Sequence, residues 1–299
     1  MKEAKHCVAF TGAGISTSAN IPDFRGPRGV WTQRERGGVS KGKNVMEAVP
    51  TFAHYAITEL VKRGLIKFVI TTNMDCLHIR SGLPRHLIIE QHGNVNKEVC
   101  VNCGTQHWRS YETTSTVLKT RDHYTCRYCN WCGGKLRDTI VHFSENWSEE
   151  HTEALSLHHS RKCDLALIMG TSMNVQPNAT FPEECLKKTP PGKMVLVNLQ
   201  KTPYDHVVNM RVFSKTDNFM FLLMKELGIE NFESVQEDIR DQWDKMTEQD
   251  MDRYYETAYG VKRKNKKKRN NIAIPTSLYL AASLLLSLSV VVGVWYKNK

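Results

Sequence analysis

The sequence predicts an α/β protein: a parallel β-sheet with helices on both faces, a small inserted Cys-rich module and a C-terminal apolar helix. Three observations predict it. A short apolar run at residues 7–10 ends in a Gly-rich turn, two Cys-x-x-Cys pairs interrupt the middle of the chain, and residues 272–296 contain no charged side chain. The 299 residues are enough for one large α/β domain and an insertion.

The Gly-rich turn at residues 11–16 (TGAGIS) follows the first apolar run and precedes small residues that can begin a helix. Strand, glycine turn and helix form the first unit of a Rossmann-like nucleotide-binding fold. Thr17 stands where dehydrogenases carry their third glycine. The spacing therefore disfavours a hydride-transfer dehydrogenase.

Three further segments, residues 68–71, 164–169 and 194–198, are apolar and rich in β-branched side chains, as buried strands are. Helix-length segments such as residues 50–63 lie between them. This alternation is typical of a parallel sheet that is covered by helices on both faces.

Five of the nine cysteines fall in one short stretch of the chain. Cys100 with Cys103, and Cys129 with Cys132, form two Cys-x-x-Cys pairs with 25 residues between them. Such pairs indicate a metal site, and four thiolates complete a tetrahedral structural zinc site with no position left for water. Cys126 forms an alternative pair with Cys129, but the Gly-Gly step after Cys132 favours the later pair. We expect one structural Zn²⁺ in a module of residues 99–139.

The positive charge of the chain is concentrated at its C-terminal end. The net charge is +10, and the residues after Val261 include nine Lys or Arg and no Asp or Glu, so 10 − 9 leaves +1 for residues 1–261. We expect a discontinuous Rossmann-like domain formed by residues 1–98 and 140–228. This domain therefore belongs to a nearly neutral part of the chain. We infer no direct nucleic-acid binding for this part of the chain.

The C-terminal segments predict a membrane anchor. Residues 229–271 are expected to form a helical and then basic linker, and residues 272–296 a transmembrane helix, since about 20 apolar residues cross a bilayer. Seven positive charges at residues 262–269 flank that helix. The pattern predicts a single-pass tail anchor with the α/β domain in the cytosol or at the nuclear envelope. The same basic run can instead be a nuclear import signal, so the nucleus remains the alternative location.

Three polar loops are candidates for a ligand site. Residues 22–31 (PDFRGPRGVW) carry an aromatic and an arginine beside the glycine turn, residues 72–75 follow the second strand, and residues 91–94 (QHGN) contain a His-Gly step. Loops at the carboxyl ends of parallel strands face the crevice where ligands bind. His92 in such a crevice is a candidate base near neutral pH.

Taken together, these segments resemble the sirtuin (Sir2) family over most of residues 5–228. The resemblance lies in GAGIST (12–17), IPDFRGPRGVWT (21–32), TTNMDCLH (71–78), EQHGN (90–94), the two Cys pairs, LRDTIVHFSEN (136–146), GTSMNVQP (170–177) and VNLQKT (197–202). The forms GVWT, LRDTI and VNLQ look most like the class IV branch, which includes the vertebrate nuclear sirtuins six and seven.

The resemblance implies an NAD⁺-dependent protein-lysine deacylase, which converts NAD⁺ and an acylated-lysine protein substrate into nicotinamide, O-acyl-ADP-ribose and deacylated lysine. The catalytic residues would be His92 as general base, Asn73 and Asp75. The implied cofactor-binding residues are Gly12, Ala13, Gly14, Asp23, Phe24, Arg25, Trp31, Thr72, Asn73, Asp75, His92, Gly170, Thr171, Ser172, Asn198, Leu199 and Gln200. Val141, His142 and Phe143 would pair with the substrate peptide as an added strand. The implied zinc ligands are Cys100, Cys103, Cys129 and Cys132.

The chain departs from the family's pattern at three positions. Thr72 replaces the usual Gln, Cys76 replaces a Gly before Leu77, and Ser144 replaces a Gly. Loss of the Gln amide removes hydrogen bonds near the nicotinamide ribose, which is expected to slow the reaction. Two other functions therefore stay open: a protein mono-ADP-ribosyltransferase, and a catalytically weak NAD- and zinc-binding scaffold at a membrane.

Overall fold

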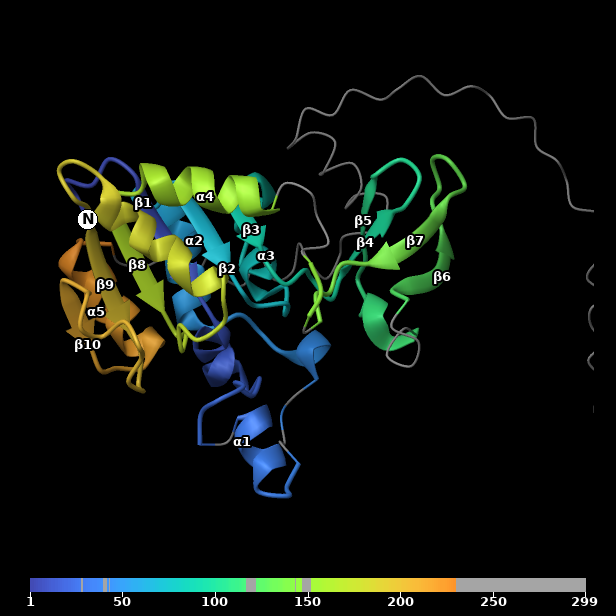
Figure 1. Cartoon of the computed structure of the whole chain (residues 1–299), viewed down its shortest axis with the longest axis horizontal. Coiled ribbons are helices and arrows are strands. Elements are labelled where there is room, and N and C mark those ends of the chain that lie inside the picture. Colours follow the sequence, from blue (N-terminus) through green and yellow to red (C-terminus); the bar gives the residue numbers. More distant parts are fainter. Residues whose placement is uncertain are drawn as a thin grey trace, which may run out of the picture. The chain divides into compact units, whose positions relative to one another are not determined.

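The computed structural model describes residues 1–27, 29–39, 42, 44–116, 122–142, 144–146 and 152–229. Its larger sheet has six strands in the order β10-β9-β8-β1-β2-β3, and all neighbouring strands are parallel (Figure 1). The strands are β1 (Cys7–Thr11), β2 (Phe68–Thr71), β3 (Ile88–Glu90), β8 (Leu165–Met169), β9 (Lys193–Val197) and β10 (Met210–Val212).

The predicted parallel sheet is confirmed. The four predicted strands are β1, β2, β8 and β9, each within one residue of its predicted ends. The two strands that were not predicted, β3 and β10, lie at the edges of the sheet and have three residues each. Strands this short are too brief to show a recognisable hydrophobic pattern.

The described helices connect the strands and cover the sheet. The α-helices are α1 (Val30–Glu35), α2 (Phe52–Lys62), α3 (Leu77–Arg80), α4 (Thr152–Lys162) and α5 (Thr216–Glu226), and the 3₁₀ helices are η1 (Ala13–Ala19), η2 (Val45–Glu47), η3 (Arg85–Leu87), η4 (Thr113–Thr116) and η5 (Asn178–Lys187). The predicted helix at residues 50–63 is α2. Its N-cap is Thr51, whose side chain forms a capping box with His54.

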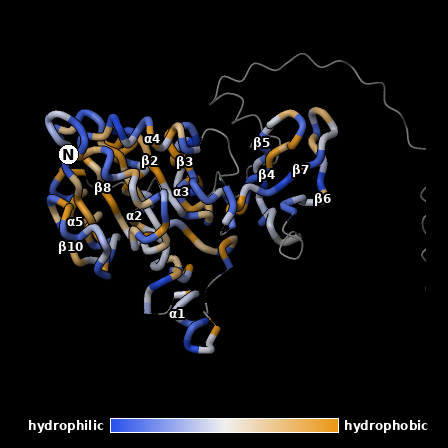
Figure 2. Tube along the Cα trace, in the orientation of Figure 1, coloured by the Kyte–Doolittle hydropathy of each residue, from blue (hydrophilic) through white to orange (hydrophobic). Residues whose placement is uncertain are grey.

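Both faces of the larger sheet are buried, which explains why its strands are apolar throughout. Along β1, Cys7 and Ala9 belong to one hydrophobic core, and Val8 and Phe10 belong to the other. Helices α2 and α5 supply residues to the first core, and α4 and η5 to the second. Figure 2 shows hydrophobic segments along the strands of this sheet.

The strand order reverses between β1 and β8. The chain runs outward from β1 through β2 to β3, and later outward on the other side from β8 through β9 to β10. Ligands of open α/β sheets bind beyond the carboxyl ends of the strands at such a reversal. The two glycine turns of the predicted site, after β1 and after β8, lie at this reversal.

A second sheet of four antiparallel strands lies between β3 and α4 in the sequence. Its order is β5-β4-β7-β6, and the strands are β4 (Lys97–Cys100), β5 (Gln106–Trp108), β6 (Tyr124–Tyr128) and β7 (Lys135–Asp138). This sheet carries the paired cysteines of the predicted insertion.

One part of the predicted fold class, the C-terminal transmembrane helix, is wrong. Of the helices that the structure describes, none has the length and apolarity needed to cross a membrane. The longest α-helices have 11 residues each, which is about 16 Å and half of a ~30 Å hydrocarbon core. Residues 230–271 and 272–296, assigned to the linker and the anchor, lie outside the described residues. The membrane anchor and the tail-anchored location, which rested on the sequence pattern alone, are therefore withdrawn, and the nuclear location stays a prediction.

Candidate active site

A cavity of about 920 Å³ lies at the carboxyl ends of the central strands, where the strand order reverses. Residues that come directly after β1, β2, β3, β8 and β9 line it. Most of the predicted site residues also line the cavity: Gly12, Ala13, Gly14, Asp23, Phe24, Arg25, Trp31, Thr72, His92, Val141, His142, Gly170, Thr171, Ser172, Asn198 and Gln200. The fold thus collects residues from seven separate stretches of sequence in one site.

The glycine turns after β1 and β8 contact each other through their main chains. The Gly14 amide donates to the Gly170 carbonyl at 2.7 Å. A Cβ atom at Gly14 would lie 2.7 Å from Gly170 Cα, and one at Gly12 would lie 2.8 Å from Thr171 Cβ. Only glycine fits these two positions without a shift of the neighbouring chain. Such turns allow a phosphate group to approach the main chain closely.

Asn73 and Asp75 do not line the cavity in the described structure; they lie behind its wall. Both are buried, and both are joined to Ser16 of η1: the Ser16 hydroxyl donates to Asp75 Oδ2 at 2.6 Å, and Asn73 Nδ2 donates to Ser16 Oγ at 3.2 Å. Burial raises the pKa of Asp75 above its usual value, although hydrogen bonds from Ser16 and the Leu77 amide oppose that rise. In this arrangement the two residues fix the helix that follows the glycine turn.

The loop at residues 22–31 forms another wall of the cavity. Asp23 Oδ1 accepts a hydrogen bond from the Gly26 amide at 2.9 Å, and the rings of Phe24 and Trp31 stack with centroids 6.2 Å apart. Gln200 Nε2, from the segment after β9, donates to the Arg25 carbonyl at 3.4 Å. Leu199 does not line the cavity, and 62% of its surface is exposed.

His92 lies on the cavity wall, two residues after β3, beside the Thr72 main chain. Burial lowers the pKa of His92, and hydrogen bonds with the Asn178 side chain and the Thr72 main chain oppose that change without cancelling it. Asn178 is itself held, since its Nδ2 donates to Gln91 Oε1 at 2.7 Å. The histidine is therefore neutral near pH 7 and positioned by neighbours, as a general base requires.

Gln91 and Asn178 belong to the site but were not predicted from the sequence as functional. They lie 87 residues apart, and Gln91 Nε2 also donates to Ser156 Oγ at 3.1 Å. Each is an ordinary polar residue in the sequence. Their proximity results from the packing of η5 and α4 beside β3, which no local pattern records.

Gly93 allows residues 139–141 to pack against the chain beside His92. It has a φ of +82°, and a Cβ atom there would lie 1.8 Å from the Thr139 carbonyl oxygen. Around it, the Val141 amide donates to the His92 carbonyl at 3.1 Å and the Asn94 amide donates to Thr139 Oγ1 at 3.0 Å. Val141 and His142 line the cavity beside this contact; Phe143 lies outside the described residues.

The substitution Gly93→Ala is expected to disrupt this contact, because both the left-handed backbone and the main-chain approach exclude a side chain. We expect a loss of stability of about 2 kcal/mol or more, measured by denaturant unfolding. Gly104 provides the matched control, because it has a φ of +69° but no atom within 4 Å of its Cβ position. A Gly93→Ala loss no larger than that of Gly104→Ala would show that the close approach is not a constraint.

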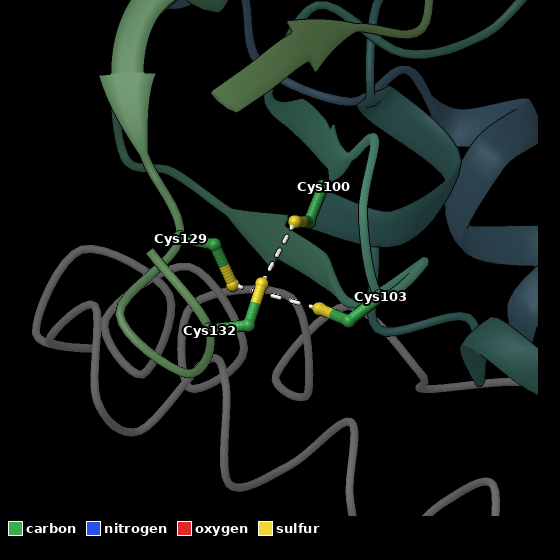
Figure 3. A group of neighbouring side chains, drawn as sticks. All are labelled: Cys100, Cys103, Cys129 and Cys132. Atoms are coloured by element: carbon green, nitrogen blue, oxygen red, sulfur yellow. Dashed lines mark hydrogen bonds between the residues drawn. The ribbon is translucent and has the colours of Figure 1, made fainter. Parts of the chain in front are cut away.

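The four predicted zinc ligands lie together at one end of the second sheet. The sulfur atoms of Cys100, Cys103, Cys129 and Cys132 all lie within 4.8 Å of one another, with Cys100 3.4 Å from Cys132 and Cys103 3.7 Å from Cys129 (Figure 3). Zn–S bonds of ~2.3 Å in a tetrahedron place sulfur atoms about 3.8 Å apart. The ligand set therefore fits one structural zinc ion, as predicted.

Cys126, the alternative partner of Cys129, does not belong to this group. Its side chain is exposed, and its backbone has a φ of +59°. His107 is a neighbour that was not predicted from the sequence: its Nε2 lies 3.3 Å from Cys129 Sγ in a buried contact. Imidazole contacts of this kind orient the ligands of a metal site.

Comparisons with known proteins agree with this architecture. The model of the Sir2 family matches residues 39–177. The chain is 43% identical over 243 residues to "NAD-dependent protein deacetylase sirtuin-7" of Rattus norvegicus, covering 77% of this chain and 58% of that protein. It is 38% identical over 240 residues to "NAD-dependent protein deacetylase Sirt6" of Drosophila melanogaster, covering 77% of this chain and 74% of that protein. These relatives agree with the predicted branch of the family.

A solved structure has the same fold. It is a Sir2 protein in complex with a deacetylated p53 peptide and 3′-O-acetyl-ADP-ribose, with a TM-score of 0.60 and 30% sequence identity. The match covers 77% of this chain and 96% of that one. From the cavity at the strand reversal, the Cys₄ group and these similarities, it follows that the chain belongs to the Sir2 (sirtuin) family.

Proposed function

We propose that this chain is an NAD⁺-dependent protein-lysine deacylase. The observation that carries the proposal is a single cavity with close-packed glycine turns on one wall and a partly buried, neutral His92 on another. The names of the relatives and the bound product of the solved structure support the same activity. The chain spans 58% of the length of the sirtuin-7 relative, so its activity, substrate and partners are proposals about the described domain.

The residues present fit NAD⁺. The turns at Gly12, Gly14 and Gly170 form a cradle that Cβ atoms would fill, which suits the pyrophosphate. Asp23, Phe24 and Arg25 would surround the pyrophosphate and nicotinamide ribose, and the residues after β8 and β9 would hold the adenosine half. When bound, NAD⁺ supplies an electrophilic ribose carbon at which the acyl-lysine oxygen displaces nicotinamide.

His92 would act on a ribose hydroxyl. A neutral imidazole can donate one ring N–H to Asn178 or to the Thr72 main chain and still accept a proton at the other nitrogen. The low pKa that burial gives His92 keeps that nitrogen unprotonated near pH 7. The ring would remove the hydroxyl proton as the hydroxyl attacks the acyl group. Asn73 and Asp75 would act as positioning residues through Ser16.

The substrate peptide would bind along residues 141–143. Val141 and His142 line the cavity, and the Val141 amide is hydrogen-bonded to the carbonyl of His92. A peptide strand paired with this segment would place its acyl-lysine side chain in the cavity, a recognition mode that uses main-chain hydrogen bonds. The hydrogen bond between Val141 and His92 would therefore link the position of the bound peptide to the position of the general base.

The test uses the full chain, an acyl-lysine peptide series and NAD⁺ labelled in its adenine ring. We expect nicotinamide release that depends on the peptide, with the label recovered as free O-acyl-ADP-ribose. Label attached to protein would instead support the mono-ADP-ribosyltransferase. Absence of nicotinamide release with every acyl chain, where a control sirtuin is active, would contradict both enzymatic functions and favour a scaffold.

Thr72 is expected to limit the rate. It lines the cavity where the family usually has a Gln, and its hydroxyl donates to the Thr11 carbonyl at 3.4 Å. A Gln at this position would add an amide that reaches the nicotinamide ribose, worth ~1 kcal/mol. Thr72→Gln should therefore raise kcat/KM about fivefold to tenfold. Thr72→Met has a similar length without the amide; an equal effect of both changes would show that the amide is not responsible.

A further inference from the structure

A second group of metal-ligating side chains lies apart from the four cysteines. The ligand atoms of His123, His142 and Glu145 all lie within 4.8 Å of one another. Nε2 of His123 is 3.1 Å from Glu145 Oε1, and the rings of His123 and His142 are 5.2 Å apart. His142 and Glu145 line the cavity of the proposed active site. No step of the proposed reaction uses these three side chains together.

Asp138 determines how His123 faces this group. Nδ1 of His123 lies 2.9 Å from Asp138 Oδ1, and the Asp138 side chain is only 2% exposed. The carboxylate accepts the Nδ1 hydrogen, so Nε2, the nitrogen that faces Glu145, carries the lone pair in the neutral ring. A lone pair and a carboxylate oxygen 3.1 Å apart repel each other unless a cation lies between them. That cation is either a proton on Nε2 or a metal ion.

The geometry points to a divalent transition-metal site formed by His123 Nε2, a ring nitrogen of His142 and a carboxylate oxygen of Glu145. A histidine that donates its other N–H to a buried carboxylate is the usual arrangement at metal sites, because the carboxylate fixes the tautomer and the ring. Bonds of ~2.1 Å to nitrogen and oxygen in a tetrahedron place these atoms about 3.4 Å apart. The observed 3.1 Å between His123 and Glu145 is close to that separation.

The ligand set favours zinc. Two imidazoles and one carboxylate suit Zn²⁺, and three protein ligands leave the fourth position open, unlike the Cys₄ site. The main chain supports the group, since the His142 amide donates to Glu145 Oε2 at 2.7 Å and the Asp138 amide donates to the His123 carbonyl at 2.8 Å. Zinc displaces the proton on Nε2 when it binds.

An occupied site would regulate the proposed reaction; this consequence rests on the proposed function. His142 belongs to the segment expected to pair with the peptide, and a metal ion bound to it would hold that segment to Glu145. We expect added Zn²⁺ to inhibit competitively with the acyl-lysine peptide and not with NAD⁺. The binding measurement below contains no substrate, so its failure is distinct from failure of the proposed function.

The test titrates ZnCl₂ into the full chain after the Cys₄ site has been filled, using isothermal titration calorimetry. We expect a second equivalent to bind. In a parallel titration with Co²⁺, the same site should show visible d–d absorption without new thiolate charge-transfer bands. His123→Gln and Glu145→Gln should each weaken this binding at least tenfold. Asp138→Asn, which removes the supporting carboxylate, should weaken it about 10- to 100-fold.

His206 provides the matched control, because it is exposed and belongs to no metal-ligating group among the described residues. His206→Gln should bind the second zinc ion as the parent chain does. Thermal unfolding checks that each variant is folded, and Glu145→Gln changes only a surface side chain. The proposal would be overturned if the protein with a filled Cys₄ site bound no second zinc ion. It would also be overturned if His123→Gln and Glu145→Gln both left the affinity for that second ion unchanged.

Discussion

Replacement of His92 by alanine is expected to reduce O-acyl-ADP-ribose formation by about 100- to 10,000-fold, the usual contribution of a positioned general base. Burial keeps the His92 ring neutral near pH 7, and the Asn178 side chain and the Thr72 main chain hold it against the cavity. Alanine removes the base without adding bulk. The measurement is steady-state product formation with a labelled cofactor at saturating peptide.

The effect of His92→Ala must be separated from a loss of folding. His92 contributes its carbonyl to the Val141 amide, and this main-chain contact survives the substitution. We therefore expect the unfolding midpoint and NAD⁺ binding to change little. Asn178→Ala should cause a smaller loss, about tenfold, because it removes one hydrogen bond to the ring.

The outcome that contradicts this role is specific. If His92→Ala retains more than about a tenth of the parent kcat, another group must take the hydroxyl proton. His206→Ala, at an exposed position that does not line the cavity, gives the baseline for loss of a surface histidine.

The larger sheet was predictable because its strands are buried on both faces. In β1 and β8 nearly every residue is apolar, and this continuous pattern, together with the glycine turn after Thr11, indicates a parallel sheet. Asn73 and Asp75 could be recognised as site residues but not placed. Their distance from the cavity depends on Ser16, whose hydroxyl joins them to the glycine turn, and no sequence spacing reveals that contact.

The group of His123, His142 and Glu145 could not be predicted from the sequence. The first two are 19 residues apart, and the β6–β7 hairpin brings His123 beside Asp138 before the chain continues to His142. In the sequence each is one of 12 scattered histidines. Cysteine pairs can be recognised in the sequence, because each Cys-x-x-Cys turn brings two zinc ligands together within four residues. Only the meeting of the two pairs depends on the fold.

The choice between Cys126 and Cys132 as the partner of Cys129 leads to the second large effect. Cys129→Ser is expected to reduce the zinc retained after gel filtration by about one ion per chain, and to destabilise the second sheet. A structural zinc ion contributes an apparent ~10–16 kcal/mol at pH 7, far more than any single packing contact in the module. Cys129 is 3% exposed and packs against Leu136, so its loss also opens the small core there.

Cys126→Ser is the matched control, because the two cysteines lie three positions apart and the change is chemically identical. Cys126 is exposed and outside the Cys₄ group, so its variant should keep zinc and unfold at the parent temperature.

Cys129→Ser should also lose deacylation. The Thr139 carbonyl packs against Gly93, directly after His92, and β7 ends one residue before Thr139. Equal zinc loss in both variants would show that Cys126 also binds zinc, contrary to the Cys₄ group of the structure. A zinc-free Cys129→Ser protein with full activity would show that the module does not position the base.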